Sequence, residues 1–136
     1  MTIAAVDYGS RRLGIAASDP AGIVIYPVGV IRRRSLNSDL VALCRQLKAL
    51  GATRVIVGWP LNMDGTTGTS AQAAEHFAQC LRAASGLEVE LQDERLSTWE
   101  ARERLKTRSK RPRASVDAIA AVIILENWFR TRNPTS

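Results

Sequence analysis

A short apolar segment at residues 54–58 (RVIVG) most constrains the fold of this chain. It is rich in β-branched residues and has no polar face, which is typical of a strand buried on both sides of a parallel sheet. A parallel strand needs a crossover, usually a helix, to reach its neighbour. Residues 35–50 suit that role, because their apolar positions follow a helical period, Ser35 is a suitable N-cap and Gly51 follows the end. The chain is therefore predicted to be an α/β protein.

The other elements follow from the same patterns. Residues 3–7, 13–18 and 23–31 are strand-like runs joined by short turns, and Pro27 places the third strand at an edge because it cannot donate to a ladder. A second helix is expected over about 70–84, a fifth strand over 87–92, and two helices over 98–107 and 115–130. This order predicts a mixed five-stranded sheet with strand order 3-2-1-4-5, flanked by helices on both faces.

Composition limits the classes of partner. A chain of 136 residues with 46% apolar content suits one domain over residues 1–136. The net charge of +6 favours polyanions as partners and disfavours acidic proteins. The longest apolar run, at residues 118–125, is too short to span a bilayer, and the N-terminus does not resemble a signal peptide. We therefore expect a cytoplasmic location and no membrane partner.

Acidic residues stand at the edges of three expected elements. Asp7 ends the first strand, Asp93 and Glu94 end the fifth, and Asp117 begins the last helix. In open α/β sheets, ligands bind at the carboxyl ends of the strands. Carboxylate oxygens are the ligands that hard cations such as Mg²⁺ prefer. Together with the basic charge of the chain, these acids indicate a metal site that acts on a phosphodiester.

Each acid also has a simpler interpretation. Asp7 could be a turn residue, and Asp117 could merely match the dipole of its helix. Asp93 and Glu94 could pair with Arg95 or cap the next helix. Alternation along the strand favours Glu94 slightly over Asp93 as a ligand, and both stay candidates. Asp117 stands at the N-terminus of a helix that is apolar on nearly every side and must therefore be buried. A carboxylate at that position needs a partner, which a metal ion would supply.

Basic residues flank the predicted metal site on two sides. Arg11 and Arg12 lie in the turn after Asp7, and a second group precedes Asp117. Such residues contact phosphates without reading sequence, although a charged run can also be a solvated loop. The polar loop at residues 60–68 contributes one further candidate. The candidate nucleic-acid-binding residues are Arg11, Arg12, Asn62, Lys106, Arg108, Lys110, Arg111 and Arg113.

Four blocks of the chain, in order, resemble the YqgF family. They are residues 7–16 (DYGSRRLGIA), 57–65 (VGWPLNMDG), 93–98 (DERLST) and 117–121 (DAIAA). Members of this family are pre-16S rRNA nucleases related to RuvC-type Holliday junction resolvases. The resemblance implies an RNase H-like fold and a nuclease that uses Mg²⁺ or Mn²⁺. It implies catalytic acids at Asp7, at Glu94 or Asp93, and at Asp117, with Asp7, Glu94 and Asp117 as the metal ligands.

The implied function is phosphodiester hydrolysis in structured RNA, during 5′-end maturation of pre-16S rRNA, with ribosomal particles as further partners. One alternative is a resolvase of Holliday junctions and other branched DNA. This is less expected, because the fourth strand ends in Gly58 where the resolvases carry an acid. A resolvase would also be a homodimer, and the sequence does not distinguish a monomer from a homodimer. A further alternative is a non-catalytic module that binds nucleic acid or ribosomes. An ATPase of the actin and sugar-kinase type would need two such domains around the nucleotide.

Overall fold

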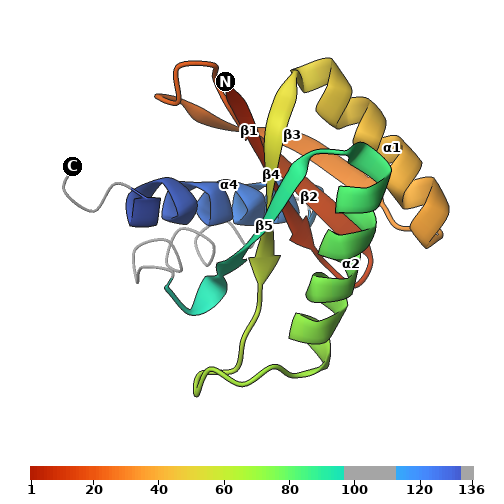
Figure 1. Ribbon diagram of the computed structural model, residues 1–136, viewed down its shortest axis with the longest axis vertical. Helices are drawn as coiled ribbons and strands as arrows, with labels where there is room; N and C mark the ends of the chain where they lie inside the picture. Colours follow the sequence, from red (N-terminus) through yellow and green to blue (C-terminus); the bar gives the residue numbers. More distant parts are fainter. Residues whose placement is uncertain (97–112, 133–136) are drawn as a thin grey trace.

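The computed structural model describes residues 1–96 and 113–132, and in this part of the chain five strands form one mixed sheet (Figure 1). The strand order is β3-β2-β1-β4-β5, as predicted. The elements are β1 (Thr2–Tyr8), β2 (Arg12–Ser18), β3 (Ile25–Arg32), α1 (Leu36–Leu50), β4 (Ala52–Trp59), α2 (Thr69–Ser85), β5 (Glu88–Asp93), the 3-10 helix η1 (Glu94–Leu96) and α4 (Arg113–Arg132).

The pairing of the strands explains why β1 is the centre of the sheet. It pairs antiparallel with β2 and parallel with β4, and β5 adds to β4 in parallel. Pro27 lies in β3, which forms the edge of the sheet beside β2, as predicted from its missing N–H group. The register between β2 and β3 shifts next to Pro27, between Ile15 and Ala16.

The helix α1 has both of the caps that its sequence predicts. The Ser35 hydroxyl accepts a hydrogen bond from the N–H of Ser38, and the two residues form a reciprocal capping box. Gly51 ends the helix in the left-handed conformation with φ of 71°, which glycine adopts without a steric cost. These local signals explain why the boundaries of α1 match the prediction closely.

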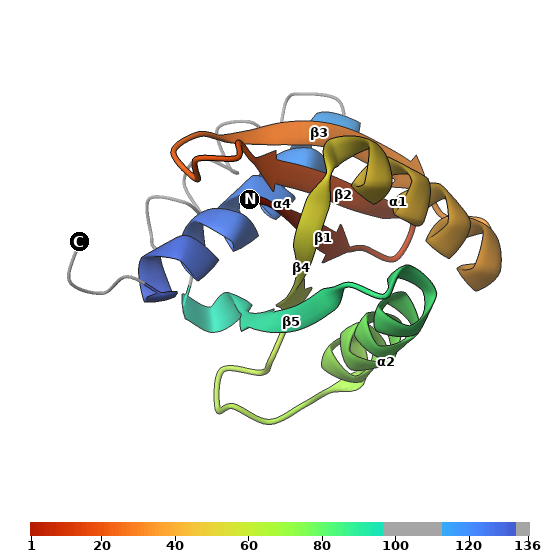
Figure 2. The same ribbon diagram turned by 45° about the horizontal axis from the view of Figure 1, so that its top comes forward.

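The sheet is covered on both faces, and the side chains of β1 alternate between two apolar cores. Ala4 and Val6 belong to the larger core, which α1 and α2 cover. Ile3 and Ala5 belong to the smaller core, which α4 covers. Figure 2 shows α4 on one side of the sheet and α1 and α2 on the other. By the same alternation Asp7 lies on the α4 face of the sheet.

Several boundaries differ from the predictions by a few residues. The strand predicted over 23–31 begins at Ile25, because the Asp19 carboxylate accepts hydrogen bonds from the N–H groups of Ile23 and Val24 and holds them in a turn. The last helix begins at Arg113 instead of residue 115. The helix predicted over 98–107 lies outside the described residues. No helix in the described ranges is long and apolar enough to cross a membrane.

Candidate active site

Asp7 lies near the carboxyl end of the central strand β1, between two glycines on the neighbouring strands. On one side it pairs directly with Gly14 of β2. On the other side Val6 pairs with Val57 of β4, so Asp7 and Gly58 follow as neighbours. Paired residues of adjacent strands direct their side chains to the same face. Both glycines therefore leave space next to the Asp7 carboxylate, on the face that α4 covers.

The spaces at the two glycines are filled by the other two predicted acids. A methyl group at Gly14 would lie 2.0 Å from the carbonyl oxygen of Asp117, so α4 packs directly on the β2 backbone at this residue, one turn after the helix begins. A methyl group at Gly58 would lie 3.1 Å from the carboxyl carbon of Glu94 and 2.7 Å from Cδ1 of Ile124. The absence of two side chains thus allows Asp117 and Glu94 to approach Asp7 from opposite sides. The sequence prediction missed both roles, although a glycine inside a strand often marks a close approach of this kind.

The electrostatics of Asp7 and Glu94 reflect this crowding. Burial, and then the charge of Asp117, raise the pKa of Asp7 to about 6. Burial, followed by the charges of Asp7 and Asp93, raises the pKa of Glu94 to about 7. Glu94 begins η1 immediately after β5, and its side chain continues the face of Gln92 and Glu90, as alternation predicted. Burial and the neighbouring carboxylates therefore disfavour the ionised forms of Asp7 and Glu94.

Asp93 behaves differently from Glu94. Its carboxylate accepts hydrogen bonds from the backbone N–H of Arg95 at 2.9 Å and from Nη2 of the same residue at 2.8 Å. Hydrogen bonds from Arg95 are the main cause of the lowered pKa of Asp93. The same guanidinium donates to the carbonyl oxygen of Met63 at 3.2 Å and so connects the loop at residues 60–68 to the end of β5. Asp93 thus has the structural role that the sequence offered as an alternative, whereas Glu94 is the acid next to Asp7.

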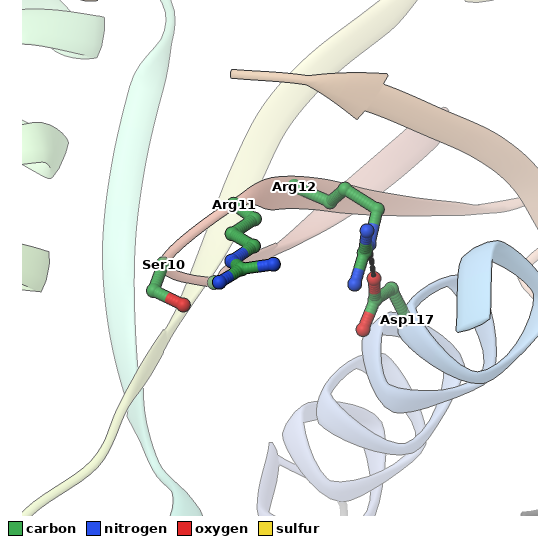
Figure 3. Close-up of a pocket in the computed structure, with 5 residues that line it drawn as sticks. Ser10, Arg11, Arg12 and Asp117 are labelled. Atoms are coloured by element: carbon green, nitrogen blue, oxygen red, sulfur yellow. Dashed lines mark hydrogen bonds and ion pairs between the residues drawn. The ribbon is translucent and has the colours of Figure 1, made fainter.

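Asp117 has a partner that the sequence analysis did not foresee. Its Oδ2 atom accepts a hydrogen bond from Nε of Arg12 at 2.7 Å, and Figure 3 shows this ion pair between the start of β2 and the first turns of α4. We expected a metal ion to supply the partner of this carboxylate. In the structure the guanidinium of Arg12 supplies it. The arginine predicted to contact phosphates is therefore also a neighbour of a predicted metal ligand.

A polar cavity of about 600 Å³ opens beside this ion pair. It lies where the turn between β1 and β2 faces the beginning of α4 (Figure 3). Its lining combines two arginines with one of the acids, so it can accept an anionic group next to the carboxylates. The lining residues are Gly9, Ser10, Arg11, Arg12 and Asp117.

Arg33 holds the turn that carries these arginines. Its Nη1 atom donates to the carbonyl oxygen of Gly9 at 2.8 Å, and its Nη2 atom donates to the hydroxyl of Tyr8 at 2.8 Å. Its backbone N–H donates to the carbonyl oxygen of Arg11 at 2.8 Å. The carboxylate of Asp39 lies 4.0 Å from Nε of Arg33. The sequence prediction missed this residue, because no local pattern relates it to the turn.

Among the remaining predicted nucleic-acid-binding residues, the structure describes the side chain of Asn62 alone. Asn62 donates from its side-chain amide to the hydroxyl of Thr66 at 3.0 Å and thereby shapes the loop at residues 60–68. Arg113 is the first residue of α4, and its side chain is outside the described part. The other four candidates also lie outside the described residues. They are Lys106, Arg108, Lys110 and Arg111.

The donor atoms near Asp7 have the chemistry that a hard divalent cation needs. Asp7, Glu94 and Asp117 supply carboxylate oxygens, and burial together with neighbouring carboxylates raises the pKa of the first two. Within residues 1–96 and 113–132, no three His, Cys, Asp or Glu side chains stand in an arrangement ready to hold one ion. Asp117 is instead turned toward Arg12. The residues therefore fit a cation chemically, and ligation by all three would require the Asp117 side chain to reorient.

Comparisons with known proteins found relatives over nearly the whole chain. A family model described as "RuvX: Holliday junction resolvase" matches residues 1–131. A protein of Anaeromyxobacter dehalogenans (strain 2CP-1) named "Putative pre-16S rRNA nuclease" is 44% identical over 132 residues, which cover 95% of this chain and 96% of that protein. A protein of Thermosynechococcus vestitus with the same name is 37% identical and covers 100% of this chain and 92% of its own.

Two solved structures share the fold at low sequence identity. RuvC of T. thermophilus, in complex with a Holliday junction substrate, superposes with a TM-score of 0.65 at 16% identity, over 99% of this chain and 97% of that chain. The Holliday junction resolvase of fowlpox virus gives a TM-score of 0.57 at 12% identity, over 96% of this chain and 99% of its own. The fold is therefore RNase H-like, as the resemblance of the sequence implied.

Proposed function

This chain belongs to the RuvX family, which is the YqgF family that its sequence resembles, and from that premise we propose that it is a divalent-metal-dependent nuclease. It would hydrolyse phosphodiester bonds in structured RNA. The proposed role is 5′-end maturation of pre-16S rRNA, the activity in the names of its relatives. The observation that carries the proposal is the position of Asp7 between Glu94 and Asp117 at the carboxyl end of the central strand.

The three acids would hold Mg²⁺ or Mn²⁺, and each has a distinct structural support. Asp7 projects from a central strand that is paired on both sides, so hydrogen bonds to β2 and β4 hold the backbone of this strand. Glu94 reaches the site over Gly58, and Asp117 reaches it over Gly14. A bound divalent cation would supply Lewis-acid stabilisation for the charge that develops at the phosphate in the transition state. It would also favour the ionised forms of Asp7 and Glu94, whose pKa values are otherwise raised.

The residues around the acids would bind and orient the nucleic acid. Arg11 and Arg12 line the cavity next to Asp117, where their guanidinium groups can contact backbone phosphates. Such contacts do not depend on base sequence, so they suit a substrate recognised by its shape. Arg33 would keep the turn that carries them in place through its bonds to Gly9 and Tyr8.

Resolution of Holliday junctions is the second candidate function. The description of the matched family model and the RuvC-like fold favour it. Gly58 counts against it, because its position at the end of β4 holds no acid and is filled by the Glu94 side chain. A resolvase that cuts two equivalent strands would also act as a symmetric dimer.

One experiment separates these functions. Wild-type protein and Asp7→Asn would be incubated with Mg²⁺ or Mn²⁺ and either a 5′-extended precursor of 16S rRNA or a four-way DNA junction. We expect metal-dependent cleavage of the RNA, and a loss on the order of 100-fold or more in Asp7→Asn, because even a misplacement of reacting groups by about 1 Å costs that much. Asp117→Asn should show a similar loss.

Asp19→Asn is the matched control, since Asp19 lies in the turn after the far end of β2 and is partly exposed to solvent. Paired cuts in the DNA junction, with the RNA left intact, would replace the proposal with a resolvase. Binding of both substrates without cleavage of either would instead indicate a binding module. Cleavage by Asp7→Asn at the wild-type rate would contradict the three-acid site.

A further inference from the structure

Arg12 and Asp117 form an ion pair between β2 and α4, and this pair affects the binding of both expected ligands, the divalent cation and the nucleic acid. Arg12 is the first residue of β2, and the Asp117 backbone packs on Gly14 of the same strand. Their side chains are 27% and 22% exposed, so the pair is partly shielded from water. Ion pairs shielded in this way are stronger than those on the open surface. The ion pair therefore competes with the binding of a cation by Asp117 and with the binding of a phosphate by Arg12.

A cation at the three acids would compete with Arg12 for the same carboxylate. The charge of Asp117 contributes to the raised pKa of Asp7, so the two carboxylates already interact. A divalent ion between them would lie close to the guanidinium that now contacts Oδ2 of Asp117. Two positive groups at that separation repel each other. Metal binding at Asp117 therefore favours the departure of Arg12.

The cavity beside the pair offers Arg12 a second partner. Arg12 lines this space of about 600 Å³ together with Arg11 and Ser10. A guanidinium that leaves Asp117 can turn toward a phosphate in the cavity and form two parallel hydrogen bonds with it. A phosphate bound there would in turn draw Arg12 away from the carboxylate. The cation thus frees Arg12 for the phosphate, and the phosphate frees Asp117 for the cation.

We propose that Arg12 exchanges between Asp117 and a substrate phosphate, so that a divalent cation and a polynucleotide bind cooperatively. This inference rests on the proposed metal-dependent function of the same site. By thermodynamic linkage, the cation must strengthen the binding of the polynucleotide by the same factor by which the polynucleotide strengthens binding of the cation. Arg12 is in this view a positioning residue that assembles the site only when both ligands are present.

The first test measures the affinity for Mn²⁺ alone by isothermal titration calorimetry, without nucleic acid. We expect Arg12→Gln to bind Mn²⁺ more tightly than Arg11→Gln by at least about 5-fold, the lower end of typical coupling between sites. Arg11→Gln is a matched control because it removes the same charge from the same cavity without removing a partner of Asp117. Equal Mn²⁺ affinities in the two variants, or weaker binding by Arg12→Gln than by the wild type, would overturn the inference.

The second test reverses the roles of the ligands and uses a short phosphorothioate RNA in the absence of metal. Asp117→Asn and Asp7→Asn remove one negative charge each, but only Asp117→Asn removes the anionic partner of Arg12. We therefore expect tighter RNA binding by Asp117→Asn than by Asp7→Asn, again by about 5-fold or more. Equal affinities would refute the exchange. This outcome is distinct from failure of the proposed function, which would appear as cleavage by Asp7→Asn.

Discussion

At the scale of single residues, the predicted site acids differ in how burial and neighbouring groups shift their pKa values. Burial and neighbouring carboxylates raise the pKa of Asp7 to about 6 and that of Glu94 to about 7. Asp93, one residue before Glu94, has a lowered pKa because Arg95 donates hydrogen bonds to it. Two adjacent acids of similar chemistry thus have opposite environments. This contrast supports Glu94 over Asp93 as the proposed metal ligand.

The raised pKa values predict how the stability of the metal-free protein depends on pH. Asp7 and Glu94 keep their protons in the folded state up to about pH 6 and 7, whereas they lose them near pH 4 in the unfolded chain. The contribution of these two groups to the free energy of unfolding is therefore fully present below about pH 4 and is lost as the pH rises through 6 and 7. Urea unfolding of the wild type and Asp7→Asn in EDTA would measure the difference in the free energy of unfolding.

We expect Asp7→Asn to become more stable relative to the wild type between pH 4 and pH 7, since an asparagine at this position does not ionise. Added Mg²⁺ should stabilise the wild type at neutral pH and have a smaller effect on the variant. A difference between the two proteins that does not change with pH would show that the Asp7 carboxyl is not perturbed in the folded state.

At the scale of elements, two strand glycines decide how closely the acids approach each other. Gly14 is in contact with the backbone of α4, which cannot move without shifting the helix. Gly58 is in contact with side-chain atoms of Glu94 and Ile124, which can rotate. The same substitution at the two positions should therefore have different effects.

Gly14→Ala should mainly destabilise the fold, by about 3 kcal/mol, the upper end of what overpacking costs. Gly58→Ala should cost less stability but displace Glu94 and so reduce cleavage. The double variant Gly58→Ala with Ile124→Val removes Cδ1, the nearest atom at 2.7 Å. It should recover stability in thermal unfolding without recovering cleavage. Recovery of both would show that Glu94 tolerates a side chain at this position.

At the scale of the whole molecule, the excess of positive charge should govern binding of nucleic acid. The net charge is +6, and two of the described arginines line the cavity beside the acids. Release of counterions from the nucleic acid makes such binding weaken as salt rises. The logarithm of the affinity should therefore fall linearly with the logarithm of the salt concentration.

Arg11→Gln should reduce the slope of this line by about 0.7 to 0.9, the value for loss of one phosphate contact. Arg45→Gln is the control, because it removes an equal charge from the exposed surface of α1, on the opposite face of the sheet from α4. Its slope should equal that of the wild type. Equal slopes in all three proteins would show that Arg11 does not contact the phosphates.

The order of the elements was predictable from the sequence, because alternation, helical periodicity and capping act between residues that are close in the chain. Ser35 and Gly51 delimit α1, and Pro27 identifies the edge strand, as their local chemistry requires. The acids at the ends of the elements could also be recognised as candidates. Alternation favoured Glu94 only slightly over Asp93, because the sequence does not show which face of the sheet meets Asp7.

The sequence by itself determined which of the described elements form, in which order the strands pair and where acidic side chains meet the sheet edge. Only the tertiary structure decided what these side chains contact. Arg12 and Asp117 are 105 positions apart, and Gly14 and Gly58 matter because of atoms from other elements that fill the space above them. Local patterns carry no information on such contacts, because they arise when the packing of the helices against the sheet brings distant residues together.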